Sequence, residues 1–337
     1  MRIAIVNDVL MAVEALHRLL TSRTAHEIAW IARDGEQAVA RCRRDLPDLI
    51  LMDLVMPRMD GVEATRRIMA GSPCPIVIVT ASVTDYPGKI FAALGAGALD
   101  AVNTPFVGGK ASAQGQRQLL AKVETIHRLL APLAPPKTVG RKAGFRSLPQ
   151  HENIVCIGAS AGGPAALARL LGGLPGSFPA AVVVAQHLDA QFAAGLAEWL
   201  GQHARLPVRL AEEGERLQPG VVYLAGRDHH LELSSPTRLG YRRAAADAIY
   251  RPSLDVLFAS AARHCRGNAV GVVLTGMGRD GAQGLLAMRE RGFLTLAQDQ
   301  ATSAVFGMPK AVIELQAAVE ILALDKIAPR LVNVFAF

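Results

Sequence analysis

The chain has 337 residues, of which 51% are hydrophobic, 5% aromatic and 19% charged, and its formal net charge is +7. This length predicts two domains, and a composition rich in Ala, Val and Leu with few aromatics favours compact α/β domains. The positive charge is modest and the sequence contains no long block of Lys and Arg, which argues against a nucleic-acid-binding groove.

Four cysteines are scattered along the chain without a CxxC pair, at Cys42, Cys74, Cys156 and Cys265. Scattered cysteines are typical of a reduced, cytoplasmic setting. The apolar part of the first eight residues is too short for a signal peptide. No uncharged apolar run reaches the length of a membrane span, so we expect a cytoplasmic protein without membrane insertion.

Short apolar runs alternate with helical patterns through the N-terminal third of the chain. Buried strands are predicted at residues 3–6, 28–32, 49–52, 76–79 and 99–102. Helices are predicted at residues 13–20, 35–44, 62–69 and 90–94. This alternation predicts a flavodoxin-like domain with a five-stranded parallel sheet and right-handed crossovers.

Three polar residues follow strands of this sheet, namely Asp8, Asp53 and Thr80. The carboxyl ends of parallel strands meet at one edge, so these side chains should converge. Two carboxylates and a hydroxyl suit Mg²⁺ and a phosphoryl group, and a carboxylate can itself be phosphorylated. Each residue alone is more simply explained as a polar cap on a strand end, but three at matching ends favour a functional site.

The run Leu-Met-Asp-Leu-Val-Met-Pro-Arg-Met-Asp-Gly at 51–61 resembles the phosphorylation motif of response-regulator receiver domains. The resemblance implies that Asp53 is the phosphoacceptor. It also implies that a CheA-type histidine kinase supplies the phosphoryl group. It also implies that Asp8, Asp53 and the backbone carbonyl of Val55 hold Mg²⁺, and that Thr80 is the switch hydroxyl.

Three residues depart from the receiver pattern. Asn7 stands where a first acidic residue is usual, Thr104 where the family has a lysine, and Ala101 where a switch aromatic often lies. Threonine offers one neutral hydroxyl in place of an ammonium, so we expect phosphorylation with a blunted response. The alternative is that another cation, Arg58 or Lys110, takes the place of the missing lysine.

A helical pattern at 119–130 ends in Ala-Pro-Leu-Ala-Pro-Pro, which breaks it. The following residues, up to about 150, are basic and contain Pro and Gly, which is typical of a solvated linker. We therefore predict a receiver domain at 1–125, a linker at 126–150 and a second domain at 151–337.

The second domain opens with an apolar run from Asn153, small residues around Ser160, a glycine pair and a helical pattern at 165–171. A strand–turn–helix of this kind can present a serine nucleophile clear of the sheet, next to the free N–H groups of a helix. A glycine-rich turn that binds a phosphate or a dinucleotide is an equally good explanation of this stretch alone.

Two later apolar runs also end in chemically useful residues. The run at 180–185 is followed by Gln186 and His187, and the run at 269–274 by a glycine-rich loop with Asp280. In a doubly wound α/β domain these residues and Ser160 share one sheet edge. A histidine can take the serine proton, and a carboxylate can orient the histidine.

Between these runs, residues 206–240 predict several short strands. Asp228, His229 and His230 invite a metal interpretation, but adjacent histidines on a strand point to opposite faces, so we predict a turn. Ser253 is predicted to be the N-cap of the next helix.

Five blocks of the second domain resemble the CheB-type chemotaxis methylesterases. They are Gly158–Gly163, Gln186–His187, Arg251–Phe258, Leu274–Gly281 and Gln298–Pro309. The resemblance implies a protein-glutamate methylesterase and glutamine deamidase that acts on the cytoplasmic domain of methyl-accepting chemoreceptors. It implies a Ser160, His187 and Asp280 triad, a backbone contribution from Met277 to the oxyanion site, and no cofactor for the esterase.

The opening Ile-Val-Asn-Asp and the run Asn103-Thr104-Pro105 also resemble the methylesterase of Wsp-type surface-sensing systems. Two other functions would also fit parts of this sequence. A dinucleotide-binding domain would need a ribose-binding acid after the next strand, where Gln186 and His187 stand instead. A non-enzymatic docking module with a vestigial hydrolase domain is opposed by the complete set of three catalytic residue types.

Overall fold

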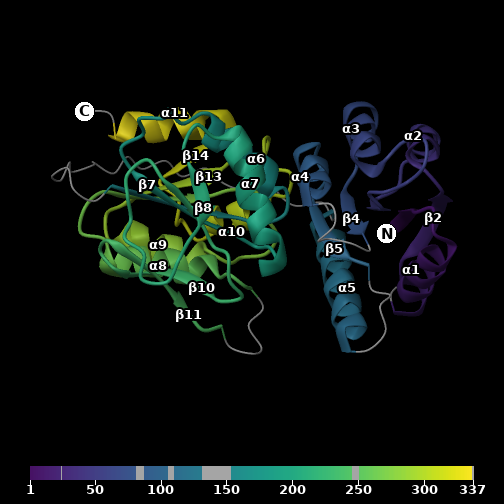
Figure 1. Cartoon of the computed structure of the whole chain (residues 1–337), viewed down its shortest axis with the longest axis horizontal. Coiled ribbons are helices and arrows are strands. Elements are labelled where there is room, and N and C mark those ends of the chain that lie inside the picture. Colours follow the sequence, from purple (N-terminus) through teal and green to yellow (C-terminus); the bar gives the residue numbers. More distant parts are fainter. Residues whose placement is uncertain (24, 81–86, 105–109, 131–152, 245–249, 336–337) are drawn as a thin grey trace. The chain divides into compact units, whose positions relative to one another are not determined.

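The computed structural model describes residues 1–23, 25–80, 87–104, 110–130, 153–244 and 250–335. The chain divides into two compact units, Met1–Pro132 and Leu133–Phe337 (Figure 1). Residues 126–130 of the predicted linker are helical, and the rest of it, up to 150, lies outside the described residues.

The first unit is built on a parallel sheet with strand order β2-β1-β3-β4-β5. Its strands are β1 (Arg2–Val6), β2 (Glu27–Ala32), β3 (Leu49–Met52), β4 (Ile76–Thr80) and β5 (Asp100–Asn103). Every residue of β3 and β4 is buried, as expected for central strands of a sheet covered on both faces. The predicted five-stranded parallel sheet is confirmed.

Helices connect these strands. They are α1 (Leu10–Arg23), α2 (Gly35–Arg44), α3 (Gly61–Gly71), α4 (Pro87–Gly95) and α5 (Lys110–Leu130). Two of them start at aspartate caps, because the Asp34 carboxylate accepts the N–H of Gln37 and the Asp60 carboxylate accepts that of Glu63. Such caps satisfy backbone donors that the first helical turn leaves free.

The second unit contains a seven-stranded parallel sheet with order β14-β13-β12-β6-β7-β9-β8. Its strands are β6 (Ile154–Ala159), β7 (Ala181–Gln186), β8 (Val208–Leu210), β9 (Val222–Leu224), β12 (Ala269–Val273), β13 (Leu294–Gln298) and β14 (Glu320–Leu322). The predicted doubly wound α/β domain is confirmed.

The helices of this unit are α6 (Gly163–Gly172), the 3₁₀ turn η1 (Ala190–Phe192), α7 (Ala193–His203), α8 (Leu254–His264), α9 (Ala282–Glu290), α10 (Met308–Glu314) and α11 (Leu324–Phe335). Figure 1 shows α6, α7 and α11 on one side of the sheet and α8 and α9 on the other. Phe258 of α8 and Leu285 of α9 pack in one buried cluster with Cys156 of β6. This packing anchors α8 against the central strands.

A hairpin of β10 (His230–Ser235) and β11 (Arg238–Arg242) lies against α8, where Leu233 N donates to Ser260 Oγ at 2.9 Å. Asp228 and His229 precede this hairpin in a bend, as predicted, whereas His230 is the first residue of β10 and not part of the turn. Within the described ranges, no cluster of three or more ligating side chains could hold a metal ion. The described helices also include none with the length and apolar character required to span a bilayer.

The strand order puts a switch in chain direction at the centre of the second sheet. The strands β12, β6 and β7 are adjacent, and the chain runs outward from β6 in one direction through β7 and in the other through β12. Such a switch of direction leaves the carboxyl ends of the strands there uncovered by a crossover helix. The three predicted catalytic residues follow these three strands.

Candidate active site

Ser160 lies in a tight bend between β6 and α6. Its N–H donates to the carbonyl of Thr275 at 3.1 Å, which ties the bend to the loop after β12. Its carbonyl accepts the Gly163 N–H at 2.7 Å and Gln186 Nε2 at 2.8 Å. Gly162 adopts a left-handed conformation with φ 72°, which turns the chain into the helix. Gln186, where a dinucleotide site would need an acid, thus braces the Ser160 bend.

Two glycines allow other groups to approach Ser160. A Cβ at Gly163 would overlap Gln186 Oε1, and a Cβ at Gly276 would lie 2.7 Å from Ser160 Cβ. Met277 follows Gly276 directly, so its backbone lies near the serine. Because the bend and the 275–277 loop enclose it, Ser160 is only 9% exposed and is less open than a free-standing nucleophile.

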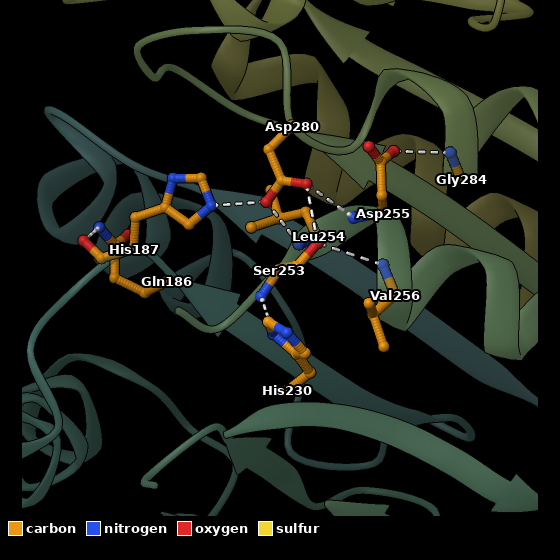
Figure 2. Close-up of polar contacts among 9 residues, drawn as sticks. All are labelled: Gln186, His187, His230, Ser253, Leu254, Asp255, Val256, Asp280 and Gly284. Atoms are coloured by element: carbon orange, nitrogen blue, oxygen red, sulfur yellow. Dashed lines mark hydrogen bonds and ion pairs between the residues drawn. The ribbon is translucent and has the colours of Figure 1, made fainter. Parts of the chain in front are cut away.

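His187 and Asp280 form a hydrogen-bonded pair, with His187 Nε2 at 2.8 Å from Asp280 Oδ2 (Figure 2). The side chains are 12% and 3% exposed. The backbone N–H of His187 donates to the carbonyl of Ala159, next to Ser160, at 3.0 Å. No hydrogen bond joins the Ser160 hydroxyl to His187 in the part of the chain described. In enzymes without substrate, this bond is often long and shortens in the substrate complex.

The carboxylate of Asp280 sits at the N-terminus of α8. Oδ2 also accepts the Leu254 N–H at 2.7 Å, while Oδ1 accepts the Ser253 hydroxyl at 2.9 Å and the Asp255 N–H at 3.1 Å (Figure 2). Burial alone raises the pKa of Asp280, but the hydrogen bond and charge of His187 and the two backbone donors outweigh it and lower the pKa. Asp280 is therefore ionised at neutral pH.

The ionised carboxylate determines the tautomer of the histidine. A carboxylate can only accept hydrogen bonds, so the proton of a neutral His187 must lie on Nε2. The lone pair is then on Nδ1, which lies on the side of the ring away from Asp280 (Figure 2). His187 can therefore accept a proton at Nδ1 while Asp280 stabilises the imidazolium that results.

Three neighbours of this pair are absent from the sequence-based site. Ser253 caps α8 as predicted, but the sequence does not reveal that its hydroxyl also bonds Asp280. His230 Nδ1 accepts the Ser253 N–H at 3.0 Å, and burial lowers the pKa of His230, which keeps it neutral. Tyr250 stacks on the His187 ring. Tyr250 and Ser253 precede α8 and His230 begins β10, both far from His187 in the chain, so no local pattern signals their meeting.

In the first unit, Asp53 also lies in a prearranged polar site. Its N–H donates to the Val6 carbonyl at 2.9 Å, and its carboxylate accepts the Leu54 N–H at 2.7 Å and Asn7 Nδ2 at 3.0 Å. The side-chain oxygen of Asn7 accepts the Val9 N–H at 2.8 Å. Asn7 thus binds Asp53 through its amide hydrogens while its oxygen has another partner.

Burial raises the pKa of Asp53 to about 6, and the charge of Asp8 adds to this effect. Hydrogen bonds from the backbone of Leu54 and Val55 act in the opposite direction. Asp8 and Val55 are exposed beside it. Two carboxylates and an accessible backbone therefore share one region, which fits a Mg²⁺ site of the receiver type.

Thr80 ends β4 and is 3% exposed, and its carbonyl accepts the Thr104 N–H at 2.9 Å. Thr104 Oγ1 is buried and has no hydrogen-bond partner among the described residues. Arg58, the proposed substitute for the missing lysine, forms an ion pair with the fully buried Asp34. The side chain of Lys110, the other candidate, lies outside the described residues.

Comparison with known proteins identifies both units. Residues 155–331 match the CheB methylesterase family, and residues 3–112 match the response regulator receiver domain family. A protein-glutamate methylesterase/protein-glutamine glutaminase of Pseudomonas savastanoi pv. phaseolicola is 57% identical, with 99% of each chain covered. One of the same designation from Cupriavidus metallidurans is also 57% identical, with 98% of each covered.

Among solved structures, the CheB methylesterase catalytic domain of Thermotoga maritima is 37% identical, with a TM-score of 0.53. The match covers 55% of this chain and 99% of that one. Relatives named as enzymes over the full length favour a hydrolase and oppose the docking-module alternative. The two family matches and the full-length identities show that this chain belongs to the CheB methylesterase family, with an N-terminal response-regulator receiver domain.

Proposed function

We propose that this chain is a phosphorylation-regulated protein-glutamate methylesterase that also deamidates glutamine. The observation that carries the proposal is the His187–Asp280 pair at 2.8 Å beside the Ser160 bend. The designations of the full-length relatives support the same activity. The substrates would be methylated glutamates on the cytoplasmic domain of methyl-accepting chemoreceptors. The Wsp-type subtype stays a prediction.

The reaction starts at Ser160. Its Oγ attacks the carbonyl carbon of the glutamate methyl ester while its proton passes to His187 Nδ1. Asp280 accepts the hydrogen bond from Nε2–H throughout and stabilises the imidazolium by its charge. The four donors to Asp280 keep this carboxylate ionised and fixed in place.

The tetrahedral oxyanion would accept hydrogen bonds from backbone N–H groups near Met277, whose loop lies against Ser160. Collapse of this intermediate breaks the bond to the methoxy oxygen, which takes the proton from His187 and leaves as methanol. With a glutamine substrate, ammonia leaves instead. Water then attacks the acyl-enzyme with His187 as base and releases glutamate.

The receiver would be phosphorylated on Asp53 by a CheA-type histidine kinase. Asp8, Asp53 and the Val55 carbonyl would hold Mg²⁺, which, when bound, neutralises charge on the phosphoryl oxygens. The proposed organisation is a receiver at 1–125, a linker at 126–150 and a catalytic domain at 151–337.

Methanol release from a methylated chemoreceptor tests the proposal. We expect Ser160→Ala to lower turnover by several orders of magnitude, as triad removal does elsewhere. Asp280→Asn should also be severely impaired, because it allows the wrong tautomer of His187. Near-normal methanol release by folded Ser160→Ala would refute the assignment.

A further inference from the structure

The ring of Tyr250 stacks on the imidazole of His187. The ring centroids are 4.8 Å apart and the planes differ by 14°, which is a nearly parallel arrangement. Tyr250 is partly exposed and comes from the segment that leads into α8, whereas His187 follows β7. The contact therefore joins two separate segments at the sheet edge.

The hydroxyl of Tyr250 is held at the other end of the ring. It lies against the loop at Gly278 and Arg279, directly before Asp280. Gly278 (φ 86°) leaves the space for it, since a Cβ there would overlap the Tyr250 hydroxyl. One tyrosine thus connects His187 to the loop that carries both Asp280 and Met277.

Tyr250 also lines a cavity of about 610 Å³. Tyr250, Ser253 and Asp280 line this cavity, together with Arg279 and Leu315. A tyrosine in this position is not a member of the apolar core. Its ring packs against the imidazole of His187, in a nearly parallel stack.

A single hydrogen bond does not fix the orientation of the imidazole ring. The hydrogen bond from His187 Nε2 to Asp280 Oδ2 fixes one point of the ring, and the imidazole can still turn about its Cα–Cβ and Cβ–Cγ bonds. Such a turn would move Nδ1. A parallel aromatic ring fixes the plane of the imidazole, and the face of a phenol also attracts the imidazolium formed during the reaction. We infer that Tyr250 is a positioning residue that holds His187 with Nε2 at Asp280 and Nδ1 toward Ser160. This inference rests on the proposed function.

The test compares Tyr250→Phe with Tyr250→Leu in the full chain. Phenylalanine keeps the stacked ring and loses only the hydroxyl, so methanol release should fall by about threefold or less. Leucine removes the parallel ring at similar apolar volume, and we expect kcat to fall by about 10- to 100-fold with KM little changed, as for a misplaced catalytic group. Equal turnover of the two variants would overturn the inference.

A double-mutant cycle with His187→Ala separates positioning from a general structural effect. If Tyr250 acts through His187, adding Tyr250→Leu to His187→Ala should leave the residual rate unchanged. Tyr241→Leu is the control, because the Tyr241 hydroxyl bonds backbone at Ala211 and Gly226 and its effect should be the same in both backgrounds.

The same cycle distinguishes a failure of the positioning role from a failure of the proposed function. An additive effect of Tyr250→Leu in the His187→Ala background would refute positioning and leave the esterase assignment intact. Normal turnover by His187→Ala itself would instead refute the proposed function.

Discussion

At the scale of single residues, one carboxylate of the second domain accepts several hydrogen bonds. Asp280 accepts hydrogen bonds from His187, from the Ser253 hydroxyl and from two backbone N–H groups at the start of α8. A buried charge without such partners would be strongly unfavourable and would take up a proton. The helix N-terminus and Ser253 therefore keep Asp280 in the form that can orient a histidine.

Ser253→Ala should weaken both the helix and the reaction. The variant loses an N-cap and one donor to Asp280, so we expect about 1 kcal/mol less stability and a kcat about 2- to 10-fold lower. The control is Ser260→Ala in the same helix, which loses the bond to Leu233 N and should lower stability without lowering kcat. Urea unfolding and methanol release measure the two effects. Equal kcat values for the two variants would contradict the role of Ser253.

Because Thr104 stands where the family has a lysine, phosphorylation of the receiver should activate the esterase only weakly. The buried hydroxyl of Thr104 carries no charge. Arg58, which could replace the missing lysine, is already paired with Asp34 and is not available to the phosphoryl group. Charge-assisted hydrogen bonds are about twice as strong as neutral ones. We therefore expect Thr104→Lys to increase activation of the esterase by acetyl phosphate or by the cognate kinase.

The control for Thr104 is Asp53→Asn, which should abolish the activation. Large activation of the unmodified chain that Thr104→Lys does not improve would argue against a blunted response. An absence of label on the unmodified chain, with Asp53→Asn behaving identically, would mean that the site is not used.

At the scale of elements, the candidate site depends on three adjacent strands and one tight bend. Ser160, His187 and Asp280 follow β6, β7 and β12, which lie side by side in the sheet. The bend after β6 is braced by Gln186 at the end of β7, whose amide donates to the Ser160 carbonyl. Close approach of the two strand ends requires that Gly163 carry no side chain.

Gly163→Ala should therefore displace Gln186 and move Ser160. A shift on the order of 1 Å at a catalytic group costs about 100-fold in rate, so we expect a loss of 10-fold or more in kcat. Gly201→Ala in α7 is the matched control, because no atom lies within 4 Å of its added Cβ. That variant should keep its turnover and gain about 0.5–1 kcal/mol from helix propensity. Unimpaired turnover by Gly163→Ala would show that the brace is unimportant.

At the scale of the whole molecule, a receiver domain is joined to a catalytic domain in one chain. A tethered domain acts at high effective concentration and can inhibit without tight intrinsic affinity. Phosphorylation then has to shift only a modest equilibrium.

Removing the receiver should release that inhibition. We expect the fragment 147–337 to have higher basal methanol release than the full chain in the absence of phosphate donor. Circular dichroism and thermal unfolding establish that the fragment is folded. Unchanged or lower activity of a folded fragment would argue that the receiver does not inhibit.

Much of this protein could be predicted from local patterns. Strands such as Ile76–Thr80 are continuous apolar runs, because both faces of a parallel sheet are buried, and such runs are visible in any sequence. Their alternation with helices predicts parallel sheets, and the rule for strand ends predicts that Ser160, His187 and Asp280 share an edge. Ser253 is predictable as an N-cap because capping depends on neighbours in the chain.

Only the tertiary structure decided which side chains meet across that edge. Tyr250 stacks on His187 from a segment 63 positions later, and the Ser253 hydroxyl of that same segment bonds Asp280. Likewise, Arg58 pairs with Asp34, so it is committed elsewhere. These contacts depend on the packing of helices and loops against the sheet. Local propensity carries no information about such partners, because their distance in space is set by the whole fold and not by their spacing in the chain.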